Sequence, residues 1–596
     1  MESKDHIIAV LPFVNLSPAA ENEYFSDGIT EEIINALSQI EKLKVISRTS
    51  SFYFKDKNIP LKEIARQLNV ATILEGSVRT AGTQVRITAQ LIEAEEDVHY
   101  WSESWDRKLE NIFEIQDEIS LLIADKLREH LGHFEIGEHL VKTQTDNLDA
   151  YKLSLKARYH FNKWNPDDVR AAIEYWEKAI SKDPGHTESY LGLADAYGFM
   201  ATTEFMPREE AWQKAANFTS KAFKLDPNNA GAHYQLANLK LYTECDFQGS
   251  VQHTLQSLAI KPNYVEAQQY MALQYIISEN MGKGVEHLQH ALELDPLNQE
   301  TQFYQAYYYY RTGQFQKALD QLNDLLVHNP KNIPALVVKS YSLMMLRKYD
   351  EVFALLDKIP ESIVMPDEDL GIRCLAYILK GDHAQAGKLV QKLKKAAEDP
   401  MAFQAHSYLF LTYANLGKID EAFKWLEKAV EMKSSIFLLS FTDPLVRNLK
   451  EDPRYPEFHK KLYPAVETKT KQDTKKNPLL ENSMESNYAL KLQDLMAQEE
   501  PYLNPGLTLR LLAAQLEMHP NQLSWLLNER FGKNFNTFIN DYRIARFKEL
   551  ALDPSNKHIS LIGLAYESGF NSKTVFNTYF KKVEGVTPKV FLENNC

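Results

Sequence analysis

Cysteine is scarce in this sequence of 596 residues, and long apolar runs are absent. The three cysteines, Cys245, Cys374 and Cys596, lie too far apart for a CxxC metal pair, and their odd number does not indicate a disulfide framework. Such usage favours a reducing compartment. No stretch approaches the roughly 18 apolar residues of a membrane span, and the run Ile7–Phe13 lacks the layout of a signal peptide. We therefore expect a cytoplasmic protein without a membrane partner.

Positive charge is also scarce over the whole chain. There are 67 Lys and Arg residues against 81 Asp and Glu, a net charge of −14, which argues against a protein that coats nucleic acid non-specifically. From Pro501 onward, however, 11 basic residues face 8 acidic ones. Because phosphate contacts need local positive charge, this C-terminal end is the part suited to DNA.

Sequence motifs of common enzyme classes are missing. The chain contains no GxxxxGK[ST], HExxH or GxSxG motif and no zinc-type cysteine pairing. We therefore expect no enzyme activity, no cofactor and no metal site.

Residues 1–135 have the pattern of an α/β domain. Ile7–Phe13 is a short apolar run typical of a buried strand, and Ile112–Leu131 has helical periodicity. Thr72–Val78 and Gln84–Ile92 flank an Ala-Gly pair and predict a hairpin.

Several sequence segments of this region resemble a known domain. The segments IAVLPFVNLS, FSDGITEEIINALS, ILEGSVR and WSESWDRKLENIFEIQDEIS are similar to the TolB-like domain that precedes tetratricopeptide arrays in bacterial regulators and cyclases. The resemblance implies an α/β interaction or sensing module with no reaction assigned to it. We see no cyclase domain after it in this chain.

Residues 146–463 predict a helical repeat array. Pro227, Pro262, Pro296 and Pro330 are spaced by 35, 34 and 34 residues, which is the period of tetratricopeptide repeats. Such repeats stack into a superhelix with a concave binding face. We expect a protein or peptide ligand for this array. Residues 464–486 are polar and lysine-rich, which predicts a flexible basic linker.

Two helix-turn-helix units are predicted within residues 487–596. In the first, Leu507–Met518 and Asn521–Phe531 are helices joined at His519-Pro520, with Gly532 as the C-cap. In the second, Ser560–Ser568 and Asn571–Lys582 are helices that turn at Gly569.

A connecting helix, Phe535–Leu552, is predicted between the two units. At 1.5 Å per residue it is roughly 27 Å long, and successive major-groove faces of DNA are about 34 Å apart. One chain could therefore place both second helices, the recognition helices, in adjacent grooves.

The C-terminal motifs closely resemble the AraC/XylS family of transcription regulators. They are LTLRLLAAQLEMHPNQLSWLLNERFGKNF and ISLIGLAYESGFNSKTVFNTYFKKVEGVTPKVF. The resemblance implies base contacts from the outward faces of the recognition helices. Asn and Gln suit adenine, Lys suits guanine, and Thr methyls suit thymine. The implied base-contacting residues are Asn521, Gln522, Ser524, Trp525, Lys573, Thr574, Asn577 and Thr578.

Trp525 departs from the family pattern, because many relatives carry a basic residue there; it either contacts a base or is simply half-buried. The implied phosphate contacts, which position the protein without specifying sequence, are Arg543, Ser572 and Lys581.

The sequence as a whole predicts a bacterial, sequence-specific transcription regulator made of an α/β domain, a tetratricopeptide solenoid and an all-α domain with two helix-turn-helix motifs. Its partners would be double-stranded promoter DNA, a ligand of the repeats and, in one arrangement, a second copy in a homodimer. We expect ligand binding to change dimerisation or to release the DNA-binding domain. The alternative is a tetratricopeptide scaffold with a vestigial DNA-binding tail.

Overall fold

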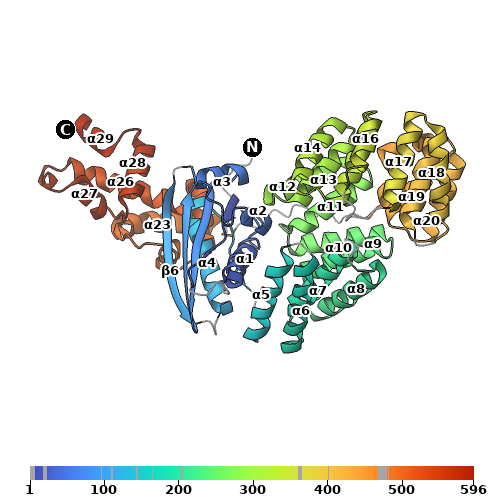
Figure 1. Ribbon diagram of the computed structural model, residues 1–596. Helices are drawn as coiled ribbons and strands as arrows, with labels where there is room; N and C mark the ends of the chain where they lie inside the picture. The colour runs from blue at the N-terminus through green and yellow to red at the C-terminus, as the bar shows by residue number, and fades with distance from the viewer. Residues whose placement is uncertain are drawn as a thin grey trace. The chain divides into compact units, whose positions relative to one another are not determined.

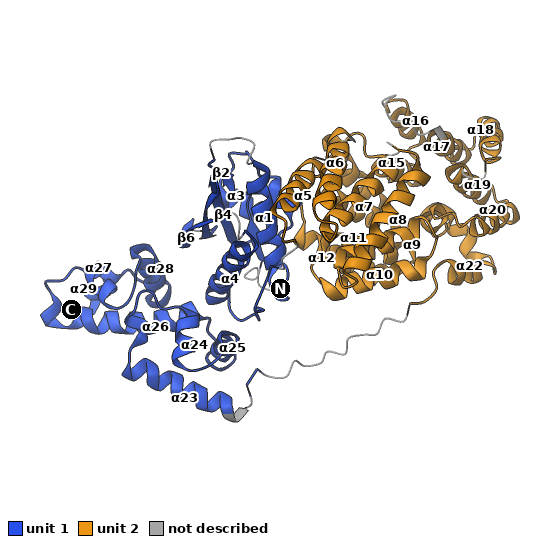
Figure 2. Ribbon diagram, turned by 90° about the horizontal axis from the view of Figure 1, so that it is seen from below, with its two compact units in different colours: residues 1–143, 469–596 blue, residues 144–468 orange. Residues whose placement is uncertain are grey.

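The computed structural model describes residues 7–17, 23–95, 97–108, 112–141, 145–163, 166–202, 206–359, 366–399, 402–466, 479–480 and 482–595. The chain divides into two compact units, residues 1–143 with 469–596 and residues 144–468 (Figure 2). Both ends of the chain therefore belong to one unit. Among the described residues, no helix is both long and apolar enough to span a membrane.

The N-terminal part of the first unit contains a mixed sheet of strand order β3-β1-β4-β5-β6, with β2 also paired to β4. The strand β1 is parallel to β3 and β4, whereas β4, β5 and β6 are antiparallel. The strands are β1 (Ile7–Val10), β2 (Val14–Asn15), β3 (Lys44–Val45), β4 (Thr72–Ala81), β5 (Gln84–Glu93) and β6 (Val98–Lys108).

Helices complete this α/β part, and α1 packs on α4 (Figure 1). Apolar side chains of β1, β4 and β5, such as Val10, Leu74 and Ile87, are buried in its core. The predicted α/β class is confirmed. The strand β6 was not expected, because most of its side chains are exposed and show little apolar alternation. The helices are α1 (Glu23–Leu37), α2 (Arg48–Phe52), α3 (Leu61–Leu68) and α4 (Ile112–Leu131).

The second unit is helical, and its successive helices pack in pairs. The prolines seen in the sequence lie where one pair ends and the next begins. Asn229, Asn298 and Asn332 follow them closely and cap α9, α13 and α15 by accepting backbone N–H groups. The helices are α5 (Leu148–Phe161), α6 (Pro166–Lys182), α7 (Thr187–Thr202), α8 (Arg208–Leu225), α9 (Ala230–Tyr242), α10 (Phe247–Ile260), α11 (Val265–Ile277), α12 (Met281–Leu294), α13 (Gln299–Arg311), α14 (Phe315–His328), α15 (Ile333–Met345), α16 (Tyr349–Leu356), α17 (Pro366–Lys380), α18 (His383–Ala396), α19 (Phe403–Asn415), α20 (Ile419–Glu431), α21 (Ile436–Ser440), η4 (Pro444–Glu451) and α22 (Tyr455–Leu462).

The last part of this unit folds back on its middle repeats. The Tyr310 hydroxyl donates to Asp443 Oδ1 at 2.6 Å, and Arg311 Nη2 donates to the Thr442 carbonyl oxygen at 2.9 Å. Thr442 in turn donates to the Ile277 carbonyl oxygen at 2.7 Å. Because these polar groups are buried and paired, they fix the C-terminal segment to α11 and α13.

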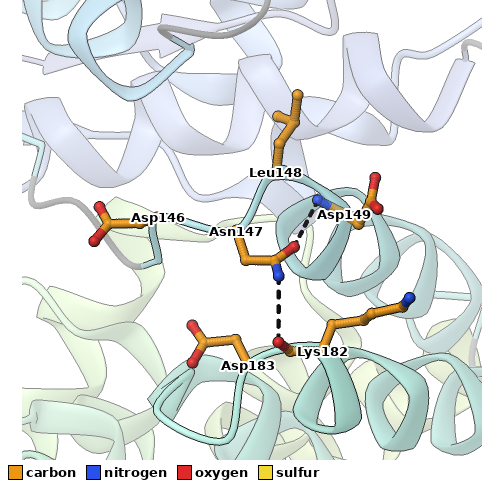
Figure 3. A pocket seen from close by; sticks show the side chains of 6 residues that line it. All are labelled: Asp146, Asn147, Leu148, Asp149, Lys182 and Asp183. Atoms are coloured by element: carbon orange, nitrogen blue, oxygen red, sulfur yellow. Dashed lines mark hydrogen bonds between the residues drawn. The ribbon is translucent and has the colours of Figure 1, made fainter.

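A polar pocket at the start of α5 is a helix-capping arrangement (Figure 3). Asn147 Oδ1 accepts from the N–H groups of Asp149 and Ala150, each at 3.0 Å, and its Nδ2 donates to the Lys182 carbonyl oxygen at 3.2 Å. Asp183 accepts from Thr145 Oγ1 at 2.5 Å. These bonds account for the pocket as a junction between α5 and α6.

The C-terminal part of the first unit is all helical, as predicted. The helix α23 begins at Asn482, within the stretch predicted as a linker, and it was not foreseen. Residues 467–478 of that stretch, with Lys469, Lys471, Lys475 and Lys476, lie outside the described residues, as does Cys596. The elements are α23 (Asn482–Gln498), η5 (Pro501–Leu503), α24 (Leu509–Gln515), α25 (Pro520–Phe531), α26 (Phe535–Leu552), η6 (Pro554–Asn556), α27 (Leu561–Glu567), α28 (Lys573–Glu584) and α29 (Pro588–Asn595).

Candidate nucleic-acid interface

The first helix-turn-helix unit consists of α24 and α25. Thr508 caps α24 by accepting from the Leu511 N–H at 3.2 Å, and His519 caps α25 in a capping box with Gln522. Gly532 ends α25 with a positive φ of 64°. The unit packs on α23 and α26 through buried side chains such as Leu512, so its local signals and its core agree.

The second unit consists of α27 and α28. Ser560 and Ser572 cap the two helices, and Gly569 forms the turn between them with a φ of 94°. Phe576 and Phe580 of α28 are fully buried against Phe547 of α26, with ring centroids 4.7 and 5.5 Å from that of Phe547. The connecting helix thus belongs to the cores of both units.

The predicted base-contacting residues of the second unit lie on an accessible face. Lys573 and Thr574 are exposed, and Asn577 and Thr578 are half-buried one turn further along α28. Among the predicted phosphate contacts, Lys581 is exposed. The side chain of Ser572 is the N-cap of α28, so it serves the start of the helix in any case.

The corresponding residues of the first unit are less accessible. Ser524 is only 3% exposed, and Trp525 is half-buried against the core of the unit. Gln522 Nε2 donates to the Leu479 carbonyl oxygen at 3.4 Å. Asn521 is hydrogen-bonded to Ile136 of the N-terminal part. The expectation of an open outward face does not hold for α25 in this conformation, because other parts of the chain cover it.

Arg543 is placed differently from the predicted phosphate contact. Its Nε donates to the Tyr502 carbonyl oxygen at 2.8 Å and its Nη2 to the Asn504 carbonyl oxygen at 2.9 Å. Desolvation by burial lowers the pKa of Arg543 to about 10. The guanidinium is therefore committed to the loop before α24.

Arg510 on α24 was not among the site residues predicted from the sequence. Its side chain is 54% exposed and forms an ion pair with Asp125 of α4. An arginine on the first helix of a helix-turn-helix unit is well placed for the DNA backbone, since that helix crosses it. The available sequence signal was a basic residue, Arg510, placed among the leucines of the first predicted helix of the unit.

Family comparisons agree with this geometry. Residues 512–594 match the family described as "Helix-turn-helix domain", and residues 4–122 match "HilA/YgeH-like transcriptional regulator, second domain". Residues 285–359 match "Anaphase-promoting complex, cyclosome, subunit 3". The C-terminal end is an AraC-type helix-turn-helix domain, and the regulator resemblance with its repeat array is confirmed. The TolB-like resemblance of the N-terminal part stays a prediction.

Curated relatives match parts of the chain. "Putative adenylate cyclase 3" of Rhizobium meliloti is 35% identical over 237 residues, 39% of each chain. "Transcriptional regulator HilA" of Salmonella typhimurium is 24% identical over 90 residues, 15% of this chain and 16% of HilA. The chain thus spans about two fifths of the first relative and about a sixth of the second. The expectation that this chain is not an enzyme is contradicted by the first relative.

Solved structures of repeat proteins are similar to parts of the chain at low identity. A tetratricopeptide repeat protein from Parabacteroides merdae is 17% identical, with 41% of this chain and 92% of that chain covered and a TM-score of 0.29. The human IFIT1 dimer with PPP-AAAA is 16% identical, with 53% and 78% covered and a TM-score of 0.33. These low scores add nothing to the helix pairing described above.

Proposed function

We propose that this protein is a sequence-specific DNA-binding transcription regulator of the bacterial cytoplasm. One observation carries the proposal: two helix-turn-helix units share the connecting helix α26, and α28 presents Lys573 and Thr574 to solvent at its N-terminal end. The N-terminal residues of a recognition helix are the ones that contact base edges. The proposed domain division is 1–135, 146–463, 464–486 and 487–596.

In the proposed complex, α28 lies in the major groove of promoter DNA. Lys573 suits the guanine edge, Asn577 suits adenine, and the methyl groups of Thr574 and Thr578 suit thymine. Lys581 at the C-terminal end of α28 would contact phosphate. The recognition helix of the first unit, α25, would lie in the adjacent groove with Asn521 toward the bases.

The repeat array would bind a protein or peptide partner. Asp195, Tyr234, Glu266 and Glu300 lie near one another on its helices α7, α9, α11 and α13. Desolvation by burial, followed by the neighbouring carboxylates, raises the pKa of Asp195 to about 7 and that of Tyr234 well above its ordinary value. Tyr234 also stacks edge-on to Tyr264, with centroids 5.7 Å apart. Aromatic and acidic groups together favour a partner that carries Lys or Arg.

Two further proposals concern the whole chain. Homodimerisation would double the DNA-reading units, and sedimentation of the full chain with and without DNA tests it. Nucleotide cyclisation is a second candidate function, favoured by the relative named "Putative adenylate cyclase 3". Formation of cyclic AMP from ATP by the purified chain would support it, and no product above a boiled control would remove it.

Selection of bound duplexes from a random pool by the full-length protein tests the main proposal. We expect an enriched motif whose binding weakens steeply with salt, because phosphate contacts release counterions. A pool without enrichment would favour the scaffold alternative, in which the C-terminal domain is vestigial.

A further inference from the structure

The two ends of the chain meet at the first helix-turn-helix unit. Asp125, Arg128 and Glu129 of α4 lie on one side of this contact, and all three are at most 4% exposed. Asn521, Arg510 and the backbone of Leu509 lie on the other side. Both sides belong to the same compact unit, shown in blue in Figure 2.

The contact of Asn521 has the pattern of an asparagine bound to adenine. The Ile136 N–H donates to Asn521 Oδ1 at 3.3 Å, and Asn521 Nδ2 donates to the Ile136 carbonyl oxygen at 3.2 Å. In the major groove, adenine offers the same pair of one N–H donor and one acceptor. The backbone N–H and C=O of Ile136 therefore occupy the Oδ1 and Nδ2 edge of Asn521 that would contact a base. Arg128 Nη1 donates to the same Oδ1.

Carboxylates of α4 bind the neighbouring arginine side chain and a backbone N–H group of α24. Asp125 pairs with Arg510, and Glu129 Oε1 accepts from the Leu509 N–H at 2.8 Å. The two acids are four residues apart and so share one helix face. On this face they present negative oxygens to α24, as a DNA backbone would.

In the part of the chain that the structure describes, the hydrogen bonds of α4 to the C-terminal helices fall on the first helix-turn-helix unit and on α26. Asn534 at the start of α26 donates to the His130 carbonyl oxygen at 2.7 Å, so α4 also reaches the connecting helix. On α25, Ser524 lies one turn beyond Asn521 and is buried. Lys573 and Thr574, at the equivalent end of α28, are exposed. One recognition helix of this chain, α25, is therefore covered, whereas the other, α28, is open.

We propose that α4 and the backbone N–H and C=O of Ile136 act as a DNA mimic that covers the first helix-turn-helix unit, so that DNA and the N-terminal part compete for Asn521 and Arg510. This inference rests on the proposed DNA-binding function and adds Arg510 as a DNA-backbone contact. Burying the Arg128 and Asp125 charges costs desolvation energy, which offsets part of the stabilisation that the hydrogen bonds of the contact provide. In the covered form only α28 reads DNA.

The test uses the full-length chain and the isosteric double variant D125N/E129Q, which removes the two charges of the mimic without touching the DNA-binding helices. E118Q is the matched control, because Glu118 lies on α4 but pairs with Arg107 at 2.6 Å. Each protein selects duplexes from a random pool, and affinity and chemical protection of the bases are measured on the selected DNA.

We expect D125N/E129Q to bind about tenfold more tightly than the wild type, since a larger fraction is competent. Its protected region should extend by about 10 base pairs, one helical turn, while E118Q behaves like the wild type. Equal affinity and equal protection in D125N/E129Q would overturn the mimic and leave DNA reading in place. A lack of enriched DNA with every protein would overturn both proposals.

A second measurement needs no substitution. Hydrogen exchange of the Ile136 amide should speed up when saturating selected DNA is added to the wild type, because Asn521 then leaves Ile136. An Ile136 amide that stays equally protected while Asn521 contacts DNA would show that the two contacts do not compete, and the proposal would fail.

Discussion

Arg543 donates from Nε to the carbonyl oxygen of Tyr502 at 2.8 Å. The same carbonyl oxygen lies against Gly569, where an added Cβ would come within 2.2 Å of it. The loop before α24 is thus clamped between the connecting helix and the turn of the second helix-turn-helix unit. This loop therefore links the connecting helix α26, which belongs to the cores of both helix-turn-helix units, to the turn at Gly569.

Replacing Arg543 by Ala should lower the free energy of unfolding by about 1–3 kcal/mol, because the carbonyl groups of Tyr502 and Asn504 lose their donors. Urea denaturation of the full-length chain measures this. The sequence had predicted a phosphate contact instead. Unchanged stability with weaker, less salt-dependent DNA binding would restore that role.

Substitution of Gly569 by Ala should cost more than about 3 kcal/mol, because a positive φ and a clash with backbone act together. Gly585 provides the control, since its φ is 74° and nothing lies within 4 Å of an added Cβ. There G585A should cost only about 1 kcal/mol. Similar losses at both positions, measured by thermal unfolding, would argue against the Tyr502 contact.

Lys573→Ala and Asn577→Ala should each lose about 1–3 kcal/mol of discrimination between the selected DNA and a site mutated at one base pair. Both side chains face away from the core, so stability should hardly change. Lys589→Ala removes the same charge from α29 and serves as the control. If K573A and N577A keep full discrimination in competition binding, α28 is not the base-reading helix.

The stability of the repeat array should depend on the protonation of Asp195. Desolvation by burial, with Glu266 and Glu188 nearby, raises the pKa of Asp195 to about 7. The folded state therefore keeps a proton that the unfolded state releases above its ordinary pKa near 3.8. Stability contributed by this group falls as pH rises from about 4 to 7.

Asp195→Asn should remove that slope and raise the free energy of unfolding at pH 7.5 by roughly 1–2 kcal/mol, after allowance for solvent screening. The buried His186 acts in the opposite direction, because burial lowers its pKa to about 4, so the difference between wild type and D195N is the informative quantity. Asp324→Asn, at an exposed site, is the control. The free energy of unfolding is measured by urea denaturation at a series of pH values. If it depends on pH in the same way for the wild type and for D195N, the prediction is contradicted.

Local sequence signals determined much of the helical structure. Gly532 and Gly569 marked turns because only glycine adopts a positive φ without strain. The spaced prolines marked the repeat boundaries. The strand β6 and the helix α23 escaped notice, because weakly amphipathic segments carry little periodic signal.

The sequence by itself determined that the chain carries repeats and two helix-turn-helix units, since caps, turns and apolar spacing are encoded within a few neighbouring residues. It also placed polar side chains on the outward faces of α25 and α28. Only the tertiary structure decided which of these faces is open. Asn521 and Ile136 are separated by 385 residues, and a contact between such distant residues depends on how whole domains pack.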